Sequence, residues 1–468
     1  MQKPELLMPA GNLEKMKFAF EYGADAVYAG VPLFSLRARE NQFKIDSVKE
    51  AVKYAHDLGK KIYLTVNIFP HNIKIEPLKK ALAEMAKLKP DAFIMADPGV
   101  INLSKKICPE IPIHLSVQAN NVNWAEVEFW KEQGVERVIL SREISLKEVK
   151  EIHEKVPEME LEFFVHGAIC MAYSGRCLLS NYMTMRDANQ GTCAHSCRWQ
   201  YKVHKEITND ELRITEEFEK EDKSVGTGRD LSKGTKCDSC IVNAKKDEMT
   251  DEGVFDPNYK PIEGRYFLEE LERPGELLEA DEDEYGTYIM NSRDLCAVEY
   301  LKELVDSGVC SLKVEGRSKS IYYAASVART YRKAIDEMSE GKEPSFDYIK
   351  ELAKTANRGF IPGFLASNPK DKAQYYEKNV PYQTHKFIGV IRKVNDDGFA
   401  EVEIRNQVLK GSVIEIIGPD FKDSFDQKLD IIKSLDGENK ESAHGGAKNV
   451  LIKFDKNVIE GMFLRQAV

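Results

Sequence analysis

The residues with the clearest chemical potential are four cysteines within 28 residues, Cys170, Cys177, Cys193 and Cys197. Thiolates are soft ligands that bind zinc, copper(I) or iron-sulfur clusters. Structural zinc sites usually combine two close cysteine pairs, whereas this stretch offers one, Cys193 and Cys197. The wide spacing of the other thiols favours an iron-sulfur cluster held by loops, with zinc or unligated redox thiols as the alternatives.

Two cysteines are candidates for the fourth ligand of such a cluster. Cys197 lies within the cysteine-rich stretch, and Cys296 returns to it from farther along the chain. Two isolated cysteines, Cys108 and Cys310, are expected to be buried like small apolar residues, which is the commoner fate of a single cysteine.

The elements that must position these thiols are short apolar runs that alternate with helical patterns. Eight such runs occur, at residues 5–8, 26–29, 61–66, 92–95, 113–117, 137–140, 161–165 and 311–314. A helix is predicted before the last run, at about residues 294–306. Eight buried strands that alternate with helices predict an α/β fold of the TIM type, a (β/α)8 barrel. An open doubly wound sheet is the competitor, but it normally uses fewer strands.

Polar residues stand where most of these runs end, which in a barrel is the face that carries the active site. Any one of them alone also fits a helix cap or a solvated loop residue, but together they predict a pocket. They are Asn67, Asp97, Gln118, Ser141, Arg142, Glu143, His166, Glu315 and Arg317.

The seventh and eighth runs are separated by about 145 residues, too many for a simple loop. Within this long insertion, residues 206–285 hold 25 acidic and 11 basic residues, and we expect a poorly packed or partly disordered segment. The whole chain has a net charge of −10. Because the acidity is concentrated in this insertion, the net charge does not exclude a nucleic-acid partner.

The periodicity changes to two after about residue 381, which predicts a small β-barrel domain. The predicted domains are therefore a barrel (1–205 with 286–345), the acidic insertion, a connecting segment (346–380) and the C-terminal domain (381–468). No apolar run is long enough to span a membrane, and an acidic residue, Glu5, precedes any signal-like stretch. We therefore expect a cytoplasmic protein with reduced cysteines and no membrane partner.

Several of these segments resemble the collagenase-like peptidase family of unknown catalytic type that is numbered thirty-two. The resemblance lies in residues 5–11, 23–30, 166–198 and 313–317, and it extends to the C-terminal domain. Length and the added β-domain are most similar to the branch of prephenate-dependent tRNA uridine hydroxylases, which make 5-hydroxyuridine at the wobble position. This resemblance implies a cytoplasmic tRNA-modifying enzyme, with prephenate as a possible co-substrate.

The resemblance also implies a four-iron four-sulfur cluster whose ligands are Cys170, Cys177, Cys193 and Cys296. Hydroxylation further requires a pocket for a base and cationic contacts to phosphate or carboxylate groups. We therefore predict catalytic roles for His166, Tyr173, Arg176 and Glu315. We predict substrate-binding roles for Asn67, Asp97, Gln118, Arg186, Arg198 and Arg317.

Two other functions remain open. A peptidase is implied by the family's name, but the sequence has neither the His-Glu-x-x-His motif of a metalloprotease nor a Gly-x-Ser-x-Gly elbow. His195, between Cys193 and Cys197, is a weak candidate for a cysteine-protease dyad, since such close neighbours in sequence seldom orient a nucleophile and its base together. A non-catalytic RNA-binding or assembly protein is the second alternative.

Overall fold

The computed structural model describes residues 3–31, 34–35, 43, 45–169, 266–269, 277–283, 286–288, 292–366, 382–395 and 398–468. Contacts between residues divide the chain into a large unit, Met1–Arg198 with Met290–Val468, and a smaller unit, Trp199–Ile289. In the smaller unit, strands β8 (Tyr266–Glu269), β9 (Leu277–Asp283) and β10 (Gly286–Tyr288) form an antiparallel sheet in the order β10-β9-β8.

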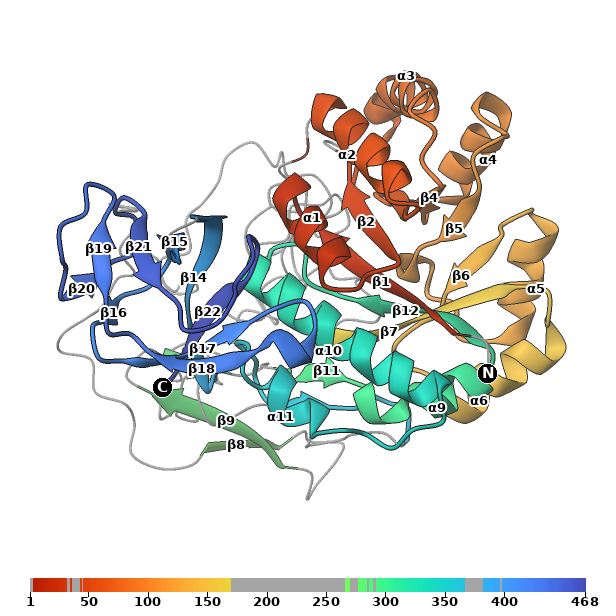
Figure 1. Cartoon of the computed structure of the whole chain (residues 1–468). Helices are drawn as coiled ribbons and strands as arrows, with labels where there is room; N and C mark the ends of the chain where they lie inside the picture. The colour runs from red at the N-terminus through yellow and green to blue at the C-terminus, as the bar shows by residue number, and fades with distance from the viewer. Residues whose placement is uncertain are drawn as a thin grey trace, which may run out of the picture. The chain divides into compact units, whose positions relative to one another are not determined.

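Eight parallel strands of the large unit close into the predicted barrel (Figure 1). The strands follow one another around the barrel, and the eighth, β12, pairs with both β1 and β7. They are β1 (Glu5–Ala10), β2 (Ala26–Gly30), β3 (Lys61–Val66), β4 (Ala92–Met95), β5 (Ile113–Leu115), β6 (Arg137–Ile139), β7 (Glu160–Ala168) and β12 (Val309–Val314). Each contains residues of one predicted apolar run, because strands covered on both faces need nearly continuous apolar sequence.

Helices connect the strands along the outside of the barrel. They are α1 (Leu13–Glu21), α2 (Ile45–Asp57), α3 (Ile75–Ala86), α4 (Pro98–Ile107), α5 (Trp124–Glu132), α6 (Leu146–Lys155), α9 (Leu301–Asp306) and α10 (Ile321–Ser339). Side chains that accept a backbone N–H fix several starts, as Asn12 does for α1 and Asn123 for α5. Ser145 and Glu148 form a reciprocal capping box at α6.

The predicted helix at 294–306 is wrong in its first half. Residues Asp294–Cys296 form strand β11, which is antiparallel to the end of β7 and parallel to β13 (Phe360–Ile361). A 3-10 turn, η8 (Val298–Tyr300), follows, and the α-helix begins only at Leu301. The three strand residues are buried, so pairing with β7 and β13 outweighs local helical preference.

The C-terminal domain is an antiparallel half-barrel with its own apolar core. Its sheet has the order β18-β17-β22-β14-β15-β21-β19. The strands are β14 (His385–Val394), β15 (Phe399–Ile404), β17 (Val413–Ile417), β18 (Phe425–Lys428), β19 (Ile432–Ser434), β21 (Val450–Lys453) and β22 (Phe463–Ala467). The short strands β16 (Val408–Leu409) and β20 (Ser442–Ala443) form a separate pair.

The C-terminal sheet is joined to the barrel by an aromatic cluster and a buried ionic cluster. Phe463 on β22 packs against Phe18 of α1 and Tyr22, the residue that follows α1, with ring centroids 4.9 and 5.5 Å apart. The Tyr22 hydroxyl donates to the carbonyl oxygens of Ile417 and Gly461 at 3.2 and 2.9 Å. The half-barrel and the barrel belong to the same compact unit of the chain.

The ionic cluster centres on Glu351 in α11 (Tyr348–Leu352). Its carboxylate lies 3.0 Å from Arg329 of α10 and 2.8 Å from Arg465 of β22. Arg465 also pairs with Glu415 at 2.6 Å. We refer to Arg329, Glu351, Glu415 and Arg465 as the interface cluster.

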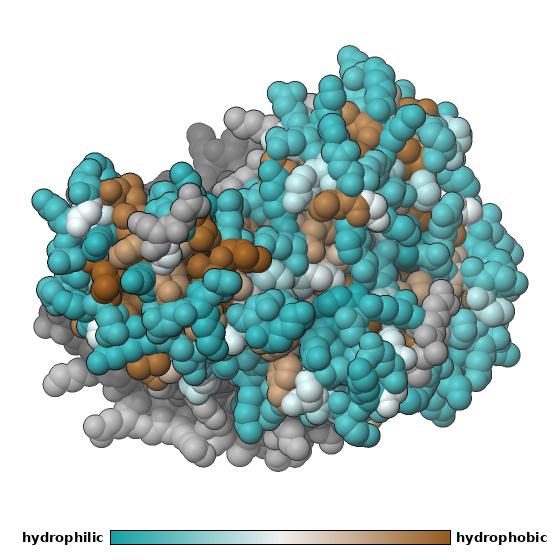
Figure 2. Space-filling view, in the orientation of Figure 1, coloured by the Kyte–Doolittle hydropathy of each residue, from teal (hydrophilic) through white to brown (hydrophobic). Residues whose placement is uncertain are grey.

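The surface of the barrel helices that faces the viewer is largely hydrophilic, and apolar residues show between them as small patches (Figure 2). Among the described residues, no helix is both long and apolar enough to cross a membrane.

Candidate functional site

The C-terminal end of β7 carries the histidine that the sequence singled out. His166 is 1% exposed, and its ring packs among Tyr323, Tyr331 and Phe360 with centroids 5.3 to 5.9 Å away. Burial lowers the pKa of His166 to about 3. The imidazole is therefore neutral near pH 7. It can form hydrogen bonds but carries no charge.

Strand β11 brings Cys296 next to this histidine. Cys296 and His166 are register partners of the antiparallel β11–β7 pair. The thiol is buried, and its Sγ lies 3.8 Å from the Tyr331 hydroxyl, which donates to the Val165 carbonyl at 2.8 Å. Among the candidate cysteine ligands, Cys296 is the one within the described residues, and it stands at the predicted end of the barrel.

The surroundings of Cys296 do not favour a free nucleophile. Burial raises its pKa to about 11, so the isolated thiol is protonated near pH 7 and a poor nucleophile. A soft metal ion or cluster displaces the thiol proton when it binds. The Cys170, Cys177 and Cys193 ligands lie outside the described residues, as do Tyr173, Arg176, Arg186 and Arg198, so their roles stay predictions.

Glu315 follows β12 and lies beside the same strand end. Its carboxylate pairs with Arg142 at 3.1 Å, and its backbone N–H donates to the His166 carbonyl at 2.8 Å. Arg142 lies over the Phe164 ring at 3.8 Å and donates to the Ala168 carbonyl at 3.3 Å. The sequence identified both charged residues separately, and the structure joins them as one ion pair.

Gly167 allows this close approach of β7 and β12. Its φ is +106°, and a Cβ there would lie 2.6 Å from the Glu315 carbonyl oxygen. Any other residue would separate the two strand ends, so this glycine is required by the position of Glu315 next to His166.

Arg317 is buried despite its charge. Its guanidinium donates to Thr65 Oγ1 at 3.2 Å and lies 5.9 Å from the Tyr28 ring centroid. Tyr28 in turn donates to the Val314 carbonyl at 2.9 Å. Arg317 therefore lies against the β2, β3 and β12 side of the barrel.

The predicted binding residues that follow β3, β4 and β5 differ in their contacts. Asn67 donates to Gln118 Oε1 at 3.0 Å and to Ser116 Oγ at 3.3 Å, so these residues form one neutral hydrogen-bonded group. Asp97 instead accepts from the Val100 N–H at 2.9 Å and caps α4. The structure thus brings Asn67 and Gln118 together and gives Asp97 the local role of a helix cap.

Sequence reasoning missed a charged network inside the barrel. Glu162 is fully buried and pairs with Lys313 at 2.7 Å and Arg137 at 3.2 Å, and Arg137 also pairs with Glu5 at 2.6 Å. The available signal was a charged residue inside some of the apolar runs, as at Glu162 and Lys313. Such residues must point into the barrel, where they need partners.

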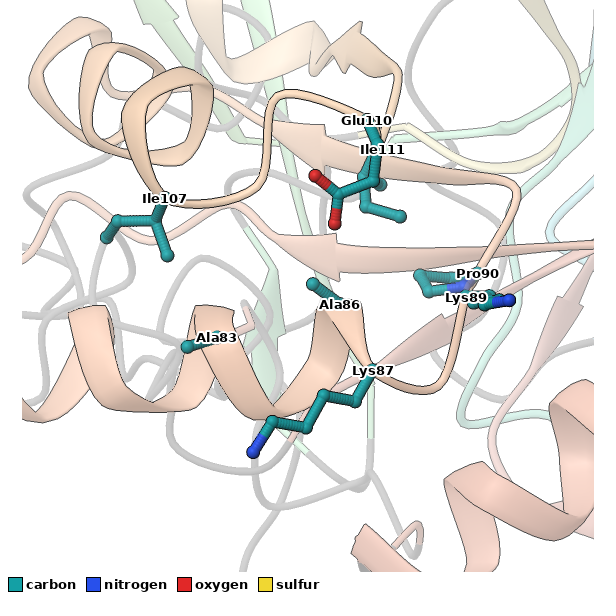
Figure 3. A pocket seen from close by; sticks show the side chains of 8 residues that line it. All are labelled: Ala83, Ala86, Lys87, Lys89, Pro90, Ile107, Glu110 and Ile111. Atoms are coloured by element: carbon teal, nitrogen blue, oxygen red, sulfur yellow. The ribbon is translucent and has the colours of Figure 1, made fainter.

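A surface pocket lies at the other end of the barrel (Figure 3). It is lined by the end of α3 and by residues just before β4 and β5, including Lys87, Pro90, Glu110 and Ile111. These residues precede the strands rather than follow them. In a barrel this is the end associated with stability rather than catalysis, so we do not place the functional site there.

The fold and the polar strand ends together define a (β/α)8-barrel enzyme whose site combines a buried thiol, a buried histidine and an arginine–glutamate pair. The sequence profile of peptidase family U32 matches residues 11–375, and the profile of the family's C-terminal domain matches residues 383–465. The chain belongs to peptidase family U32.

Two relatives are similar over nearly the whole chain. The Escherichia coli (strain K12) protein named tRNA hydroxylation protein P is 44% identical, with 96% of this chain and 93% of that protein covered. The Bacillus subtilis (strain 168) protein named tRNA hydroxylation protein P1 is 33% identical, with coverage of 99% and 95%. The solved structure of the U32 peptidase Mk0906 is 16% identical with a TM-score of 0.31, and it covers 36% of this chain and 70% of that one.

Proposed function

We propose that this protein is an enzyme that hydroxylates tRNA. The observation that carries the proposal is the 44% identity to a tRNA hydroxylation protein across 96% of the chain. The aligned region covers nearly the whole chain rather than one module. A shared fold alone would not support a shared reaction.

The finer proposal is that the enzyme converts the wobble uridine to 5-hydroxyuridine and uses prephenate as a co-substrate. The conversion replaces the C5–H bond by C5–OH and removes two electrons from the base, so it needs an oxygen donor and a two-electron acceptor that the chain's own side chains do not supply. Arg142 and Arg317 supply cationic groups next to the strand ends, and guanidinium groups suit carboxylates and phosphates. Tyr173, Arg176, Arg186 and Arg198 are proposed to complete these contacts.

The proposed cofactor is a four-iron four-sulfur cluster, held by Cys170, Cys177, Cys193 and Cys296. Its support in the structure is the buried, uncharged setting of Cys296, which suits a cluster thiolate because burial and hydrogen bonding tune such centres. When bound, the cluster would supply redox chemistry that protein side chains lack. His166 and Tyr331 would lie next to its Cys296 ligand and define that wall of the site.

The peptidase alternative finds no comparable support in the described residues. A cysteine protease needs a thiol with a lowered pKa and a histidine base in contact with it. Cys296 instead contacts the Tyr331 hydroxyl, and burial raises its pKa. These surroundings do not support nucleophilic attack by this thiol.

The experiment expresses this chain in a bacterial host whose own tRNA hydroxylation genes have been deleted. Mass spectrometry of nucleosides from purified tRNA should then detect 5-hydroxyuridine or its derivatives, with the empty vector as the control. Absence of these nucleosides, although the folded protein accumulates, would contradict the proposal.

A further inference from the structure

Strands β15, β21 and β19 of the C-terminal sheet have two different faces. One face is apolar, and its residues, such as Val402, Ile452 and Ile432, lie in the core of the half-barrel. The residues between them are on the opposite, outer face, because side chains alternate along a strand. The outer residues are all half-buried or exposed, and they are Phe399, Glu401 and Glu403 on β15, Leu451 and Lys453 on β21, and Lys433 on β19.

The register of the strands gathers three lysines on this outer face. Lys453 is directly opposite Phe399, and Lys393 on the neighbouring strand β14 is directly opposite Glu401. Residues opposite each other in an antiparallel pair have their side chains on the same face. The Lys433 ammonium lies 4.7 Å from the centroid of the Phe399 ring. We refer to Lys393, Lys433 and Lys453 as the lysine face.

Ion pairs do not cancel the positive charge of the lysine face. Within the part of the chain that the structure describes, none of its three ammonium groups pairs with a carboxylate. Glu401 instead accepts from the Asn449 amide at 2.7 Å, and Glu403 pairs with Arg392 and Arg405 at 2.5 and 2.8 Å. Both acidic residues of the outer face are therefore engaged with other groups.

This positive charge is local. Residues 381–468 hold 13 basic and 14 acidic residues, so the C-terminal domain as a whole is not basic. The lysines that lack a partner share one face of the sheet, whereas others in the domain, such as Lys410 and Lys422, pair with a carboxylate. Such a separation of paired and unpaired charges indicates that the lysine face meets a negatively charged partner.

The lysine face adjoins the end of the barrel that carries the candidate site. Arg392, next to Lys393 on β14, pairs with Glu14 in the first turn of α1 at 2.5 Å. Because α1 begins just after β1 ends, Glu14 lies at the C-terminal end of the barrel, where barrel enzymes bind substrate. A macromolecule bound at that end can therefore extend onto the lysine face.

A nucleic-acid backbone fits this surface. Its phosphates form a regular row of negative charges, and lysine ammonium groups bind phosphates as point charges, without selecting a base. The Phe399 ring attracts the Lys433 ammonium through its π electrons and so holds that charge at the outer face. The sheet thus presents spaced cations to a polyanion.

We propose that Lys393, Lys433 and Lys453 bind backbone phosphates of the tRNA away from the nucleotide that is modified. This inference rests on the proposed function and assigns it a surface that anchors the body of the substrate. Phosphate contacts supply affinity without sequence information. The lysine face therefore contributes to how tightly tRNA binds and not to which base is chosen.

The first experiment measures the salt dependence of tRNA binding. Fluorescence anisotropy with a labelled, unmodified tRNA transcript compares the full-length wild-type protein with K433Q/K453Q at several salt concentrations. Each lost lysine–phosphate contact reduces the slope of log K against log salt by about 1. The double variant should therefore lose about 2 from this slope and bind at least about tenfold more weakly at low salt. K433R/K453R keeps both charges and should bind like the wild-type protein.

The matched control removes the same charge from the same domain. Lys410 pairs with Glu441 and Lys422 with Asp420, both at 3.0 Å. K410Q/K422Q should keep the affinity and the salt slope of the wild-type protein. Both double variants should keep its melting temperature, because exposed charges contribute little to stability. Equal weakening by the two double variants would show that only the total charge matters, and would overturn the inference.

The second experiment tests whether the lysine face selects a base. Two stem-loop RNAs that differ in one loop pyrimidine should lose affinity for K433Q/K453Q by the same factor, because phosphate contacts do not read sequence. A loss confined to one of the two RNAs would place these lysines in base recognition and contradict the proposed role.

The outcomes also separate this inference from the proposed function. If the wild-type protein hydroxylates tRNA but K433Q/K453Q binds tRNA with the wild-type affinity and salt slope, the lysine face does not bind RNA and the function stands. An acidic protein partner at this face would give that same result. If the wild-type protein neither binds nor modifies tRNA, the proposed function itself fails, and this inference fails with it.

Discussion

The amides of the Asn120–Asn121 pair, in the loop between β5 and α5, and the interface cluster are both buried and polar, but they differ in whether the protein supplies the partners. In the interface cluster, Glu351 lies within 3.0 Å of both Arg329 and Arg465. The two asparagine amides have no such partner in the described residues. Buried polar groups that are matched within the chain hold domains together, whereas unmatched ones need a partner such as ordered water, an ion or a ligand.

Cys296 is the proposed cluster ligand within the described residues, and its removal should have the largest effect. We expect C296A to reduce the hydroxylated nucleosides in tRNA at least about 100-fold in the complementation assay, because the proposed cluster loses a ligand. C310A is the matched control, because the Cys310 thiol on β12 donates to the Leu161 carbonyl at 3.4 Å and is assigned no ligand role. Equal activity of the two variants would remove Cys296 from the site.

Acid should weaken the interface cluster. Burial alone would raise the pKa of Glu351, but Arg465, Lys354 and Arg329 more than offset it, and the pKa is about 2 against an ordinary value of 4.5. Glu351 therefore stabilises the fold above about pH 4.5, and this contribution, about 3 kcal/mol, is lost as the pH falls toward 2.

Denaturant unfolding of the wild-type protein and E351Q at several pH values measures this contribution. The difference in the free energy of unfolding between the two proteins should shrink as the pH falls from 5 to about 2. A difference that stays constant over this range would show that Glu351 is not an ionised partner of the two arginines.

Loss of the Asn123 cap should lower the free energy of unfolding by less than loss of the Glu351 charge. N123A removes the acceptor for the Glu126 N–H at the start of α5, and we expect it to cost about 1 kcal/mol of unfolding free energy. Thermal melting of N123A and N121L sharpens the comparison, because the partnered asparagine should be needed for stability and the unpartnered one should not. Equal destabilisation by both variants would contradict this distinction.

The smallest effect is expected at a partly exposed contact between the barrel and the C-terminal sheet. Arg392 pairs with Glu14 at 2.5 Å, and both side chains are more than a quarter exposed. E14Q should therefore cost less than about 1 kcal/mol, and the cost should fall further in high salt. If E14Q lowered the free energy of unfolding as much as loss of the Glu351 charge does, exposed and buried ion pairs would contribute equally to stability, contrary to this account.

The barrel strands could be predicted from the sequence because their signal is local. Runs such as residues 61–66 and 92–95 coincide with β3 and β4. Strand β11 could not be predicted, because Asp294, Leu295 and Cys296 take their conformation from β7 and β13. Pairing partners more than 60 residues away in sequence leave no local pattern.

The sequence could predict which strand ends carry the site residues, but it could not predict which of these residues contact one another. His166, Glu315 and Cys296 were all identified, yet the strand pairing that brings them together depends on β11 and on Gly167. Asn120 and Asn121 lie in a polar loop where buried and solvated amides have the same sequence pattern. Their burial depends on the hydrogen bond that joins the loop to the end of β6, which the sequence does not reveal.

The most direct test of the account is the iron and acid-labile sulfide content of the full-length protein purified without oxygen. The account predicts about four iron and four sulfide ions per chain in the wild-type protein, and a marked loss of both in C296A but not in C310A. Stoichiometric zinc in place of iron, or equal iron in the two variants, would contradict a cluster at this end of the barrel.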